Sequence, residues 1–292
     1  MSAPGHREVS EQASALRRVG EERRATIDGV SLRYWEVRRG SRYLVFLHGN
    51  SMCKEVFYRQ FDAFSGGEWS LLAIDLPGHG GSSDAADPGR QYTIPGYADL
   101  VLQLLAELAI ANPVILGWSL GGNIALELAG RGTTIAGIML VGTPPVGPGT
   151  RDFAAAFQAR ALESPAMGAE ATDQDLVDFV QDAVGALDPV PECFAAAAIR
   201  TDGRARETMG THWAEGTSGH DQLSVIANWQ GPIACVMGQD DALARVDFVE
   251  KADWGNLWKD EVQVLPGSSH APFLHDPGRF NLLLRDFLES SG

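Results

Sequence analysis

The sequence predicts an α/β fold built on a mostly parallel, eight-stranded sheet flanked by helices. From Tyr43 onward, short apolar runs alternate with helical patterns, as in sheets whose parallel strands are joined by right-handed crossovers. The alternation stops after Val141, gives way to helical patterns alone between residues 151 and 229, and then resumes. With 292 residues, 45% of them hydrophobic, the chain is long enough for one domain with a large core. We therefore expect a helical cap inserted after the sixth strand.

The strands are predicted from short runs of apolar residues. The first two, residues 24–27 and 32–37, are joined at Asp28-Gly29, a dipeptide suited to a tight hairpin turn. The six later strands are expected at residues 43–47, 71–74, 114–116, 135–141, 233–237 and 262–265.

Helices are predicted where apolar residues recur at helical spacing. Those of the core are expected near residues 54–63, 97–108, 120–129, 246–252 and 277–288. The run from Gly142 to Gly149 is rich in Pro and Gly and can continue neither a helix nor a central strand. Beyond it, four inserted helices are expected near residues 152–162, 173–183, 192–199 and 204–214.

These elements divide the chain into three parts. Residues 1–23 form a predicted mobile N-terminal extension, because they are polar and show no strand or helix pattern. Residues 24–143 and 230–292 form the predicted α/β core, and residues 144–229 form the predicted helical cap.

Charge and hydropathy exclude several classes of partner. Lys and Arg total 23 against 38 Asp and Glu, so the net charge of -15 repels phosphate backbones and anionic lipids. The longest apolar runs fall far short of the roughly 20 residues that span a bilayer. The N-terminus lacks the apolar core of a secretory signal. We expect a cytoplasmic monomer or homodimer that binds neither nucleic acid nor membranes.

The three cysteines indicate no covalent or metal framework. Cys53, Cys193 and Cys235 are widely separated, odd in number and outside any CxxC or Cys/His ligand spacing. We expect buried or neutral thiols and predict no metal site.

Residues Val114 to Asn123 predict a nucleophile elbow. They form an apolar strand, then the pattern Gly-x-Ser-x-Gly centred on Ser119, then a helix. A serine on so sharp a turn has a strained backbone, and its hydroxyl projects clear of the sheet at a helix N-terminus. The flanking glycines are needed because side chains there would collide with neighbouring strands. Ser119 is therefore the predicted nucleophile.

A serine nucleophile needs a histidine as base and a carboxylate that orients the histidine. After an elbow, the order along the chain is Ser, then Asp or Glu, then His. His270 follows the last strand in a loop that can reach the elbow, whereas His275 is expected to serve at the start of the final helix. Asp240 and Asp241 follow the seventh strand, where catalytic groups gather in parallel sheets. We prefer Asp241, since related sequences commonly read Gly-x-x-Asp here, and Asp240 is the alternative.

Acyl transfer also needs donors for the developing oxyanion, each worth roughly 10² to 10³ in rate. The predicted donors are the backbone N–H groups of Asn50, in the loop after the third strand, and of Leu120, directly after the serine. His48 lies between that strand and a glycine and is expected to brace the loop. The turn from Asp75 to Ser82 is likewise expected to be structural.

Taken together, these motifs resemble the α/β-hydrolase superfamily from about Arg24 to the C-terminus. The matching segments are His48-Gly49-Asn50, Asp75 to Ser82, Gly117 to Gly122, Gly238 to Asp241 and Gly267 to His270. The resemblance implies an α/β-hydrolase fold. Serine at position 119, where dehalogenases and soluble epoxide hydrolases carry aspartate, argues against those two chemistries.

A closer similarity is to the serine-dependent N-acyl-homoserine lactonases of this fold. The segments that carry it are His48 to Ser51, Gly117 to Gly122, Gly142 to Val146, Thr201 to Arg206, Gly255 to Trp258 and His270 to Phe273. The match at Thr201 to Arg206 is the most informative about substrate, because the cap shapes the pocket. Asp241 stands where such lactonases can carry glutamate, which changes the length of the side chain that orients the histidine.

The resemblance implies hydrolysis of the lactone ring of N-acyl-homoserine lactones (quorum quenching), with neither a metal nor an organic cofactor. Ser119 would attack the lactone carbonyl as His270 takes its proton, and Asp241 would stabilise the imidazolium. The N–H groups of Asn50 and Leu120 would hold the oxyanion. Water activated by His270 would then hydrolyse the acyl-enzyme.

The acyl chain of such a substrate needs an apolar channel. The candidate lining residues are Met and aromatic side chains, each of which could instead belong to the core: Trp118, Met52, Phe57, Phe153, Phe179, Phe194, Met209 and Trp213.

Other functions fit the same motifs. A broad-specificity carboxylesterase, or a hydrolase of carbon-carbon bonds in ring-cleavage products, would use the same triad under a different cap. A ligand-binding homologue without catalysis, such as a receptor, is disfavoured by the intact Ser119, Asp241 and His270.

Overall fold

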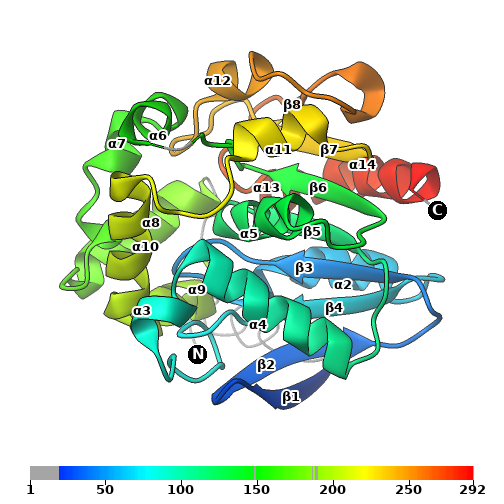
Figure 1. Ribbon diagram of the computed structural model, residues 1–292, viewed down its shortest axis with the longest axis horizontal. Coiled ribbons are helices and arrows are strands. Elements are labelled where there is room, and N and C mark those ends of the chain that lie inside the picture. The colour runs from blue at the N-terminus through cyan, green and yellow to red at the C-terminus, as the bar shows by residue number, and fades with distance from the viewer. Residues whose placement is uncertain (1–19, 148, 186, 188–189, 292) are drawn as a thin grey trace, which may run out of the picture.

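Eight strands form one mixed sheet in the computed structural model, which describes residues 20–147, 149–185, 187 and 190–291. The strands are β1 (Glu21–Ile27), β2 (Val30–Val37), β3 (Tyr43–Leu47), β4 (Ser70–Ile74), β5 (Val114–Trp118), β6 (Gly137–Val141), β7 (Ile233–Gly238) and β8 (Gln263–Leu265). Their order is β1-β2-β4-β3-β5-β6-β7-β8, and only the β1–β2 and β2–β4 pairs are antiparallel. The predicted mostly parallel sheet flanked by helices is confirmed (Figure 1).

The first two strands form the predicted hairpin. Asp28 and Gly29 both have positive φ, 48° and 79°, which suits a two-residue turn with the twist of the flanking strands. β1 begins at Glu21, so the predicted boundary of the N-terminal extension at residue 23 is wrong by three residues. The side chains at this end of the edge strand are exposed and charged, so no apolar pattern marks it. Residues 1–19 of that extension lie outside the described part of the chain.

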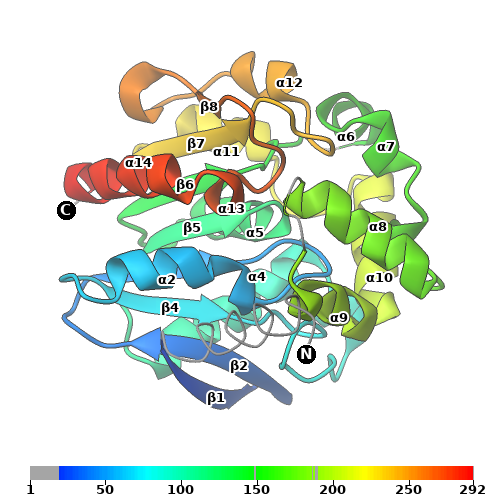
Figure 2. The same ribbon diagram turned by 180° about the vertical axis from the view of Figure 1, so that it is seen from behind.

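Helices cover both faces of the sheet. Figure 1 shows α4 (Ile94–Glu107) and α5 (Leu120–Gly130) in front of it, and Figure 2 shows α2 (Tyr58–Phe64) and α14 (Pro277–Ser290) on the opposite face. Successive residues of β3 point to opposite faces of the sheet. Val45 belongs to the hydrophobic cluster that includes α4 and α5, whereas Phe46 belongs to the cluster that includes α2 and α14. Burial on both faces explains why the central strands are continuous apolar runs.

Several short helices complete the core. They are η1 (Lys54–Phe57), α3 (Pro88–Gln91), α12 (Val246–Glu250), η3 (Trp258–Asp260) and α13 (Pro272–His275). The predicted helix at residues 54–63 is therefore a 3-10 turn followed by α2, and α3, η3 and α13 were not predicted because a single turn has too few residues to show periodicity.

The chain between β6 and β7 forms a series of helices, called the inserted helices below. They are α6 (Thr150–Ala156), α7 (Ala159–Leu162), η2 (Pro165–Met167), α8 (Asp173–Val184), α9 (Glu192–Arg200), α10 (Gly203–Glu215) and α11 (Gln222–Asn228). Figures 1 and 2 show α6 to α10 together at the end of the sheet where β5 passes into α5. The predicted helix at 152–162 is interrupted, because Phe157 bridges to Ala244 and the N–H of Gln158 donates to the Leu243 carbonyl at 2.8 Å.

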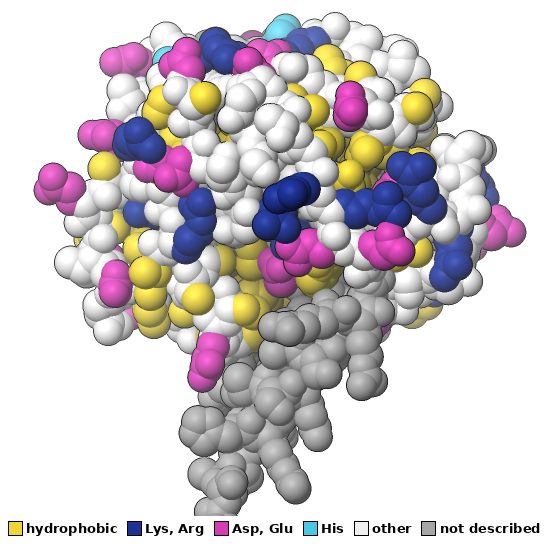
Figure 3. Space-filling view, turned by 90° about the horizontal axis from the view of Figure 1, so that it is seen from below, with side chains coloured by type: hydrophobic (Ala, Val, Ile, Leu, Met, Phe, Trp, Pro, Cys, Tyr) yellow, Lys and Arg dark blue, Asp and Glu magenta, His cyan; other side chains and the backbone are white. Residues whose placement is uncertain are grey.

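The surface mixes charges of both signs. Figure 3, a view from below, shows basic and acidic side chains interspersed with apolar ones on one face. Within the described residues, the chain forms no helix with the length and apolar character needed to cross a bilayer.

Candidate active site

Ser119 lies on a sharp turn between β5 and α5. Its backbone has φ 54° and ψ −117°, a strained conformation for a residue with a side chain. The turn is locked on both sides: the Ser119 N–H donates to the Val141 carbonyl at 2.9 Å, and its carbonyl accepts from the N–H of Gly122 at 2.9 Å. The expected elbow is therefore present in the backbone.

Both glycines of the Gly-x-Ser-x-Gly pattern are required for steric reasons. A Cβ atom on Gly121 would collide with the backbone of Leu47 at the end of β3, and one on Gly117 would collide with the backbone of Gly121. Helix α5 can approach the sheet this closely only without those side chains. The close approach brings the N-terminus of α5 to Ser119.

His270 and Asp241 form a buried pair. The Nδ1–H of His270 donates to both carboxylate oxygens of Asp241, at 2.9 and 3.0 Å, and both side chains are buried. Asp241 Oδ1 also accepts from the N–H groups of Leu243 and Ala244, at 2.9 and 2.8 Å. These two hydrogen bonds fix the orientation of the carboxylate independently of the histidine. The neighbouring Asp240 is exposed. Of the two predicted alternatives, the structure thus places Asp241 at the imidazole.

The loop that carries His270 is braced from two sides. Trp118 Nε1–H donates to the His270 carbonyl at 2.9 Å, and the Trp118 ring packs edge-on against Phe273. His275 Nδ1 accepts from the Ser269 N–H at 2.9 Å, and its Nε2 contacts the Val184 carbonyl at the end of α8.

The expected role of His275 at the start of the final helix is wrong. Asp276 caps α14 instead, through a hydrogen bond from the Arg279 N–H. The His275 ring instead contacts backbone groups of Ser269, in the loop, and of Val184, at the end of α8.

Asn50 and Leu120 line the same cavity as Ser119 and His270. Among the described residues, neither backbone N–H donates a hydrogen bond, so both are available to an oxygen atom that forms next to Ser119. The Asn50 side-chain amide faces the inserted helices and donates weakly to Met167 Sδ at 3.8 Å.

His48 is held as a neutral ring behind the Asn50 loop. Its Nε2 accepts from the Leu76 N–H at 3.0 Å and its Nδ1–H donates to the Gly49 carbonyl at 2.8 Å. Burial lowers the pKa of His48 to about 4, since a charged imidazolium would lose its hydration there. The ring therefore braces the loop and is not placed as a base.

Asp75 organises the turn after β4. Its carboxylate accepts from the Lys54 N–H at 2.7 Å, from Lys54 Nζ at 2.9 Å and from the Gly81 N–H at 2.8 Å, and the two contacts with Lys54 are buried. This carboxylate ties the turn to the segment that follows the Asn50 loop.

A small apolar cavity of about 50 Å³ opens beside Ser119. Four of the eight predicted lining residues are there: Phe153, Phe179, Met209 and Trp213. The cavity is also lined by residues that the sequence did not single out: Phe157, Ala161, Leu162, Met167 and Leu243. Leu243 could have been found from its place two residues after Asp241, but the others show no signal that separates them from ordinary helix positions.

The structure places the other four predicted lining residues in the core. Trp118 packs on the His270 loop, and Phe57 stacks between Phe46 and Phe273 at 5.1 and 5.3 Å between ring centres. Met52 and Phe194 are fully buried in the same cluster. These side chains support the site from behind and do not line the cavity.

The remaining expectations concern thiols and metals. Cys53 and Cys235 are buried and Cys193 is half-buried, all three are free, and burial raises the pKa of each, so the thiols are neutral. In the part of the chain that the structure describes, no group of three or more His, Cys, Asp or Glu side chains is arranged to hold a metal ion.

The chain belongs to the α/β hydrolase family, whose sequence model matches residues 44–281. It is similar to the N-acyl homoserine lactonase AidH, solved as a mutant complexed with N-hexanoyl homoserine lactone. The two are 33% identical with a TM-score of 0.87, over 93% of this chain and 98% of that one. The esterase RhEst1 from Rhodococcus sp. shares the fold, with 24% identity and a TM-score of 0.71 over 94% of this chain and 100% of that one.

Two curated relatives match most of this chain at lower identity. The pimeloyl-[acyl-carrier protein] methyl ester esterase of Yersinia enterocolitica is 27% identical over 280 residues, which is 88% of this chain and 98% of that protein. The biotin biosynthesis bifunctional protein BioHC of Teredinibacter turnerae is 27% identical over 84% of this chain, and the match spans 44% of that longer protein.

Proposed function

We propose that the protein is a serine hydrolase that opens the lactone ring of N-acyl-homoserine lactones through an acyl-enzyme on Ser119. One observation carries this proposal: an elbow serine and a histidine paired with Asp241 meet at an apolar cavity walled by the inserted helices. The similarity to a lactonase of the same family along nearly the whole chain supports it.

In the proposed first step, Ser119 Oγ attacks the lactone carbonyl carbon while His270 Nε2 takes the hydroxyl proton. The buried Asp241 carboxylate stabilises the imidazolium. The carbonyl oxygen becomes an oxyanion that accepts from the N–H groups of Asn50 and Leu120. The bond from carbonyl carbon to ring oxygen then breaks, and the ring oxygen takes the proton from His270.

In the second step, His270 takes a proton from water as the water attacks the acyl-enzyme. The collapse of this second intermediate frees Ser119 Oγ, which recovers its proton from His270. The sum is one lactone and one water converted to one N-acyl-homoserine, whose carboxylic acid ionises at neutral pH and releases a proton.

The lining of the cavity supports an apolar acyl group as substrate. Its polar residues are Asn50, Ser119 and His270, and every other lining residue is apolar. At about 50 Å³ the cavity is much smaller than the roughly 300–1,000 Å³ of sites that hold small molecules. We infer that the helices that line it separate when such a substrate enters.

A broad-specificity carboxylesterase is the second candidate. The triad would hydrolyse an open ester by the same two steps, and the similar proteins described above include two esterases. The two candidates differ in whether the site accepts a five-membered lactone ring with an acylamino substituent.

Titration at constant pH tests the proposal, because ring opening releases acid. The purified protein is given short- and long-chain N-acyl-homoserine lactones, beside a Ser119→Ala variant. We expect acid release by the wild type and a loss of about three orders of magnitude or more in the variant. A wild type that hydrolyses p-nitrophenyl esters but releases no acid from any lactone would replace the lactonase proposal by the carboxylesterase.

A further inference from the structure

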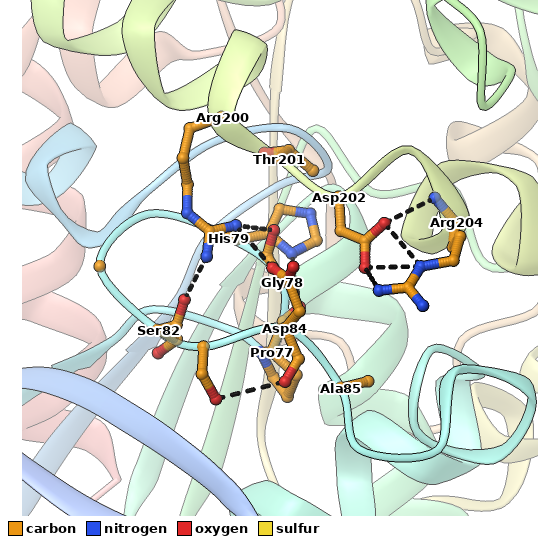
Figure 4. A network of polar contacts seen from close by, with 12 residues as sticks. Pro77, Gly78, His79, Ser82, Asp84, Ala85, Arg200, Thr201, Asp202 and Arg204 are labelled. Carbon is orange, nitrogen blue, oxygen red and sulfur yellow. Dashed lines mark hydrogen bonds and ion pairs between the residues drawn. The ribbon is translucent and has the colours of Figure 1, made fainter.

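The segment Thr201 to Arg206, which contributes to the resemblance to N-acyl-homoserine lactonases, does not line the cavity. It begins in the short link between α9 and α10 and continues into α10. Figure 4 shows this corner facing the loop after β4, with Arg200 at the end of α9 pointing toward that loop. Any influence of this segment on the cavity must therefore pass through its contacts with neighbouring elements.

Two residues of this corner bind the backbone of the loop. The Arg200 guanidinium donates to the Gly78 carbonyl at 2.9 Å and to the Ser82 carbonyl at 2.7 Å, and it pairs with Asp84 at 3.0 Å. The Asp202 N–H donates to the same Gly78 carbonyl at 2.9 Å. Both contacts join the corner between α9 and α10 to the Gly78 carbonyl of the core.

The Asp202 side chain adds a second attachment. The Tyr92 hydroxyl, in the segment between α3 and α4, donates to Asp202 Oδ2 at 2.7 Å, and Asp202 also caps α10 by accepting from the Arg204 N–H at 3.0 Å. Arg204 folds back onto the same carboxylate on the exposed side (Figure 4).

The loop that receives Arg200 is fixed by the core. Ser82 Oγ–H donates to the Asp75 carbonyl at 2.6 Å and accepts from the Arg33 N–H at 2.8 Å, and the Asp75 carboxylate holds the Gly81 N–H. His79 beside it is fully buried, and burial lowers its pKa to about 3, so it brings no positive charge toward the guanidinium near neutral pH. The corner therefore takes its position from the loop.

The proposed catalytic groups and the apolar lining of the cavity come from different parts of the chain. Ser119, Asp241, His270, Asn50 and Leu120 all follow core strands directly. Most of the apolar lining comes from the inserted helices instead, and α10 supplies Met209 and Trp213. The Trp213 ring stacks on Phe153 of α6, with 5.2 Å between ring centres. A shift of the α9–α10 corner would move this wall and leave the catalytic groups in place.

We propose that Arg200 is a positioning residue that holds α10 on the core, so that Met209 and Trp213 form the wall that binds long acyl chains. This proposal rests on the proposed function. An interaction that is equally strong in the bound substrate and in the transition state changes KM and leaves kcat unchanged. Removal of Arg200 therefore raises KM for long acyl chains and spares the chemistry of a short ester.

The test compares N-decanoyl-homoserine lactone with p-nitrophenyl acetate in an Arg200→Ala variant. For the lactone we expect KM to rise by about fivefold or more with kcat within about twofold, and for the acetate both constants to stay within about twofold. Arg200→Lys should restore part of the loss, because an ammonium group keeps the charge and can donate to a carbonyl but lacks the two separated NH₂ groups of the guanidinium.

Asp84→Asn is the matched control. It removes the charged partner of Arg200 but leaves both carbonyl contacts, and the pair is solvent-exposed. All constants should stay within about twofold of the wild type, because exposed ion pairs contribute little.

Two results would overturn the role of Arg200. One is an unchanged KM for the lactone in Arg200→Ala, and the other is a proportional fall of kcat for both substrates, which indicates general damage to the fold. If the wild type hydrolyses esters but no lactone, the proposed function fails, and the role of Arg200 is decided by p-nitrophenyl decanoate against acetate. A wild type that hydrolyses neither overturns both proposals.

Discussion

At the scale of single residues, the Asp241 carboxylate is oriented by its own chain before it orients His270. Its Oδ1 accepts two backbone N–H groups, from Leu243 and Ala244, so the side chain has one available orientation in the buried site. This arrangement fixes which tautomer of His270 is stable, since a carboxylate can only accept and Nδ1 must therefore carry the proton. Nε2 then carries no proton, as the proposed role of base requires.

Asp241→Asn tests that assignment with little change in shape. The Asn oxygen can still accept from Leu243 and Ala244, but its NH₂ faces His270 Nδ1 and forces the proton to Nε2. We expect kcat to fall by about 10³ to 10⁴, the scale of a triad with the wrong tautomer. Steady-state kinetics measures the loss, and urea denaturation should show a nearly unchanged free energy of unfolding.

Asp240→Asn is the control for this substitution, because Asp240 is adjacent in sequence but exposed. Its kcat should match the wild type. An Asp240→Asn variant as inactive as Asp241→Asn would show that the carboxylate has been misassigned.

The sequence singles out the residues that meet at the cavity because each has a local signal. Ser119, Asp241 and His270 each follow the end of a strand close to a glycine, a pattern that sequence alone shows. Lining residues have no such signal: Phe179 lines the cavity and Phe57 is core, yet both are aromatic residues in a helical segment. Which of the two a position becomes depends on how the inserted helices pack.

At the scale of elements, strands were easier to predict than the inserted helices. The apolar runs of β3 and β5 are buried on both faces, so their residue types leave little choice of structure. The break between α6 and α7 is different, because it depends on a bridge from Phe157 to Ala244, nearly ninety residues later. Helical periodicity contains no information about such a contact.

A pair of Phe variants separates cavity from core. Phe179→Ala enlarges the cavity, so we expect the ratio of kcat/KM for N-dodecanoyl- over N-butanoyl-homoserine lactone to rise about fivefold. Phe194→Ala instead removes a fully buried ring from the core, which should cost about 3–5 kcal/mol in the free energy of unfolding and leave that ratio unchanged. Kinetics on both lactones and urea denaturation measure the two effects. Equal ratios in the two variants would contradict the placement of Phe179 on the cavity.

At the scale of the whole molecule, two buried histidines couple the stability of the fold to pH. Burial lowers the pKa of His48 to about 4 and that of His79 to about 3, below the ordinary value of 6.5. Below about pH 6.5 the unfolded chain therefore binds protons that the folded chain does not. Stability is fully present above that pH and falls as the pH drops toward 4.

We expect each histidine to lower the free energy of unfolding by about 2 kcal/mol between about pH 7.5 and pH 5. Urea denaturation at the two pH values measures the difference. In a His79→Gln variant, the free energies of unfolding at the two pH values should differ by about 2 kcal/mol less than in the wild type. This holds whatever the stability of the variant at pH 7.5. His212→Gln is the control, since that ring is partly exposed and its Nδ1 contacts the Thr217 hydroxyl. A full pH effect in His79→Gln would rule out this explanation.

The small cavity beside Ser119 also determines how a substrate is captured. We infer that an N-acyl-homoserine lactone, which is larger than this narrow cavity, associates with the fraction of proteins whose inserted helices have separated. The apparent dissociation constant is then the intrinsic constant divided by that fraction. In a rapid-mixing experiment, the observed rate of capture rises with substrate concentration only until it equals the rate of helix separation. The rate at that plateau would measure the separation of the inserted helices and not the diffusion of the substrate.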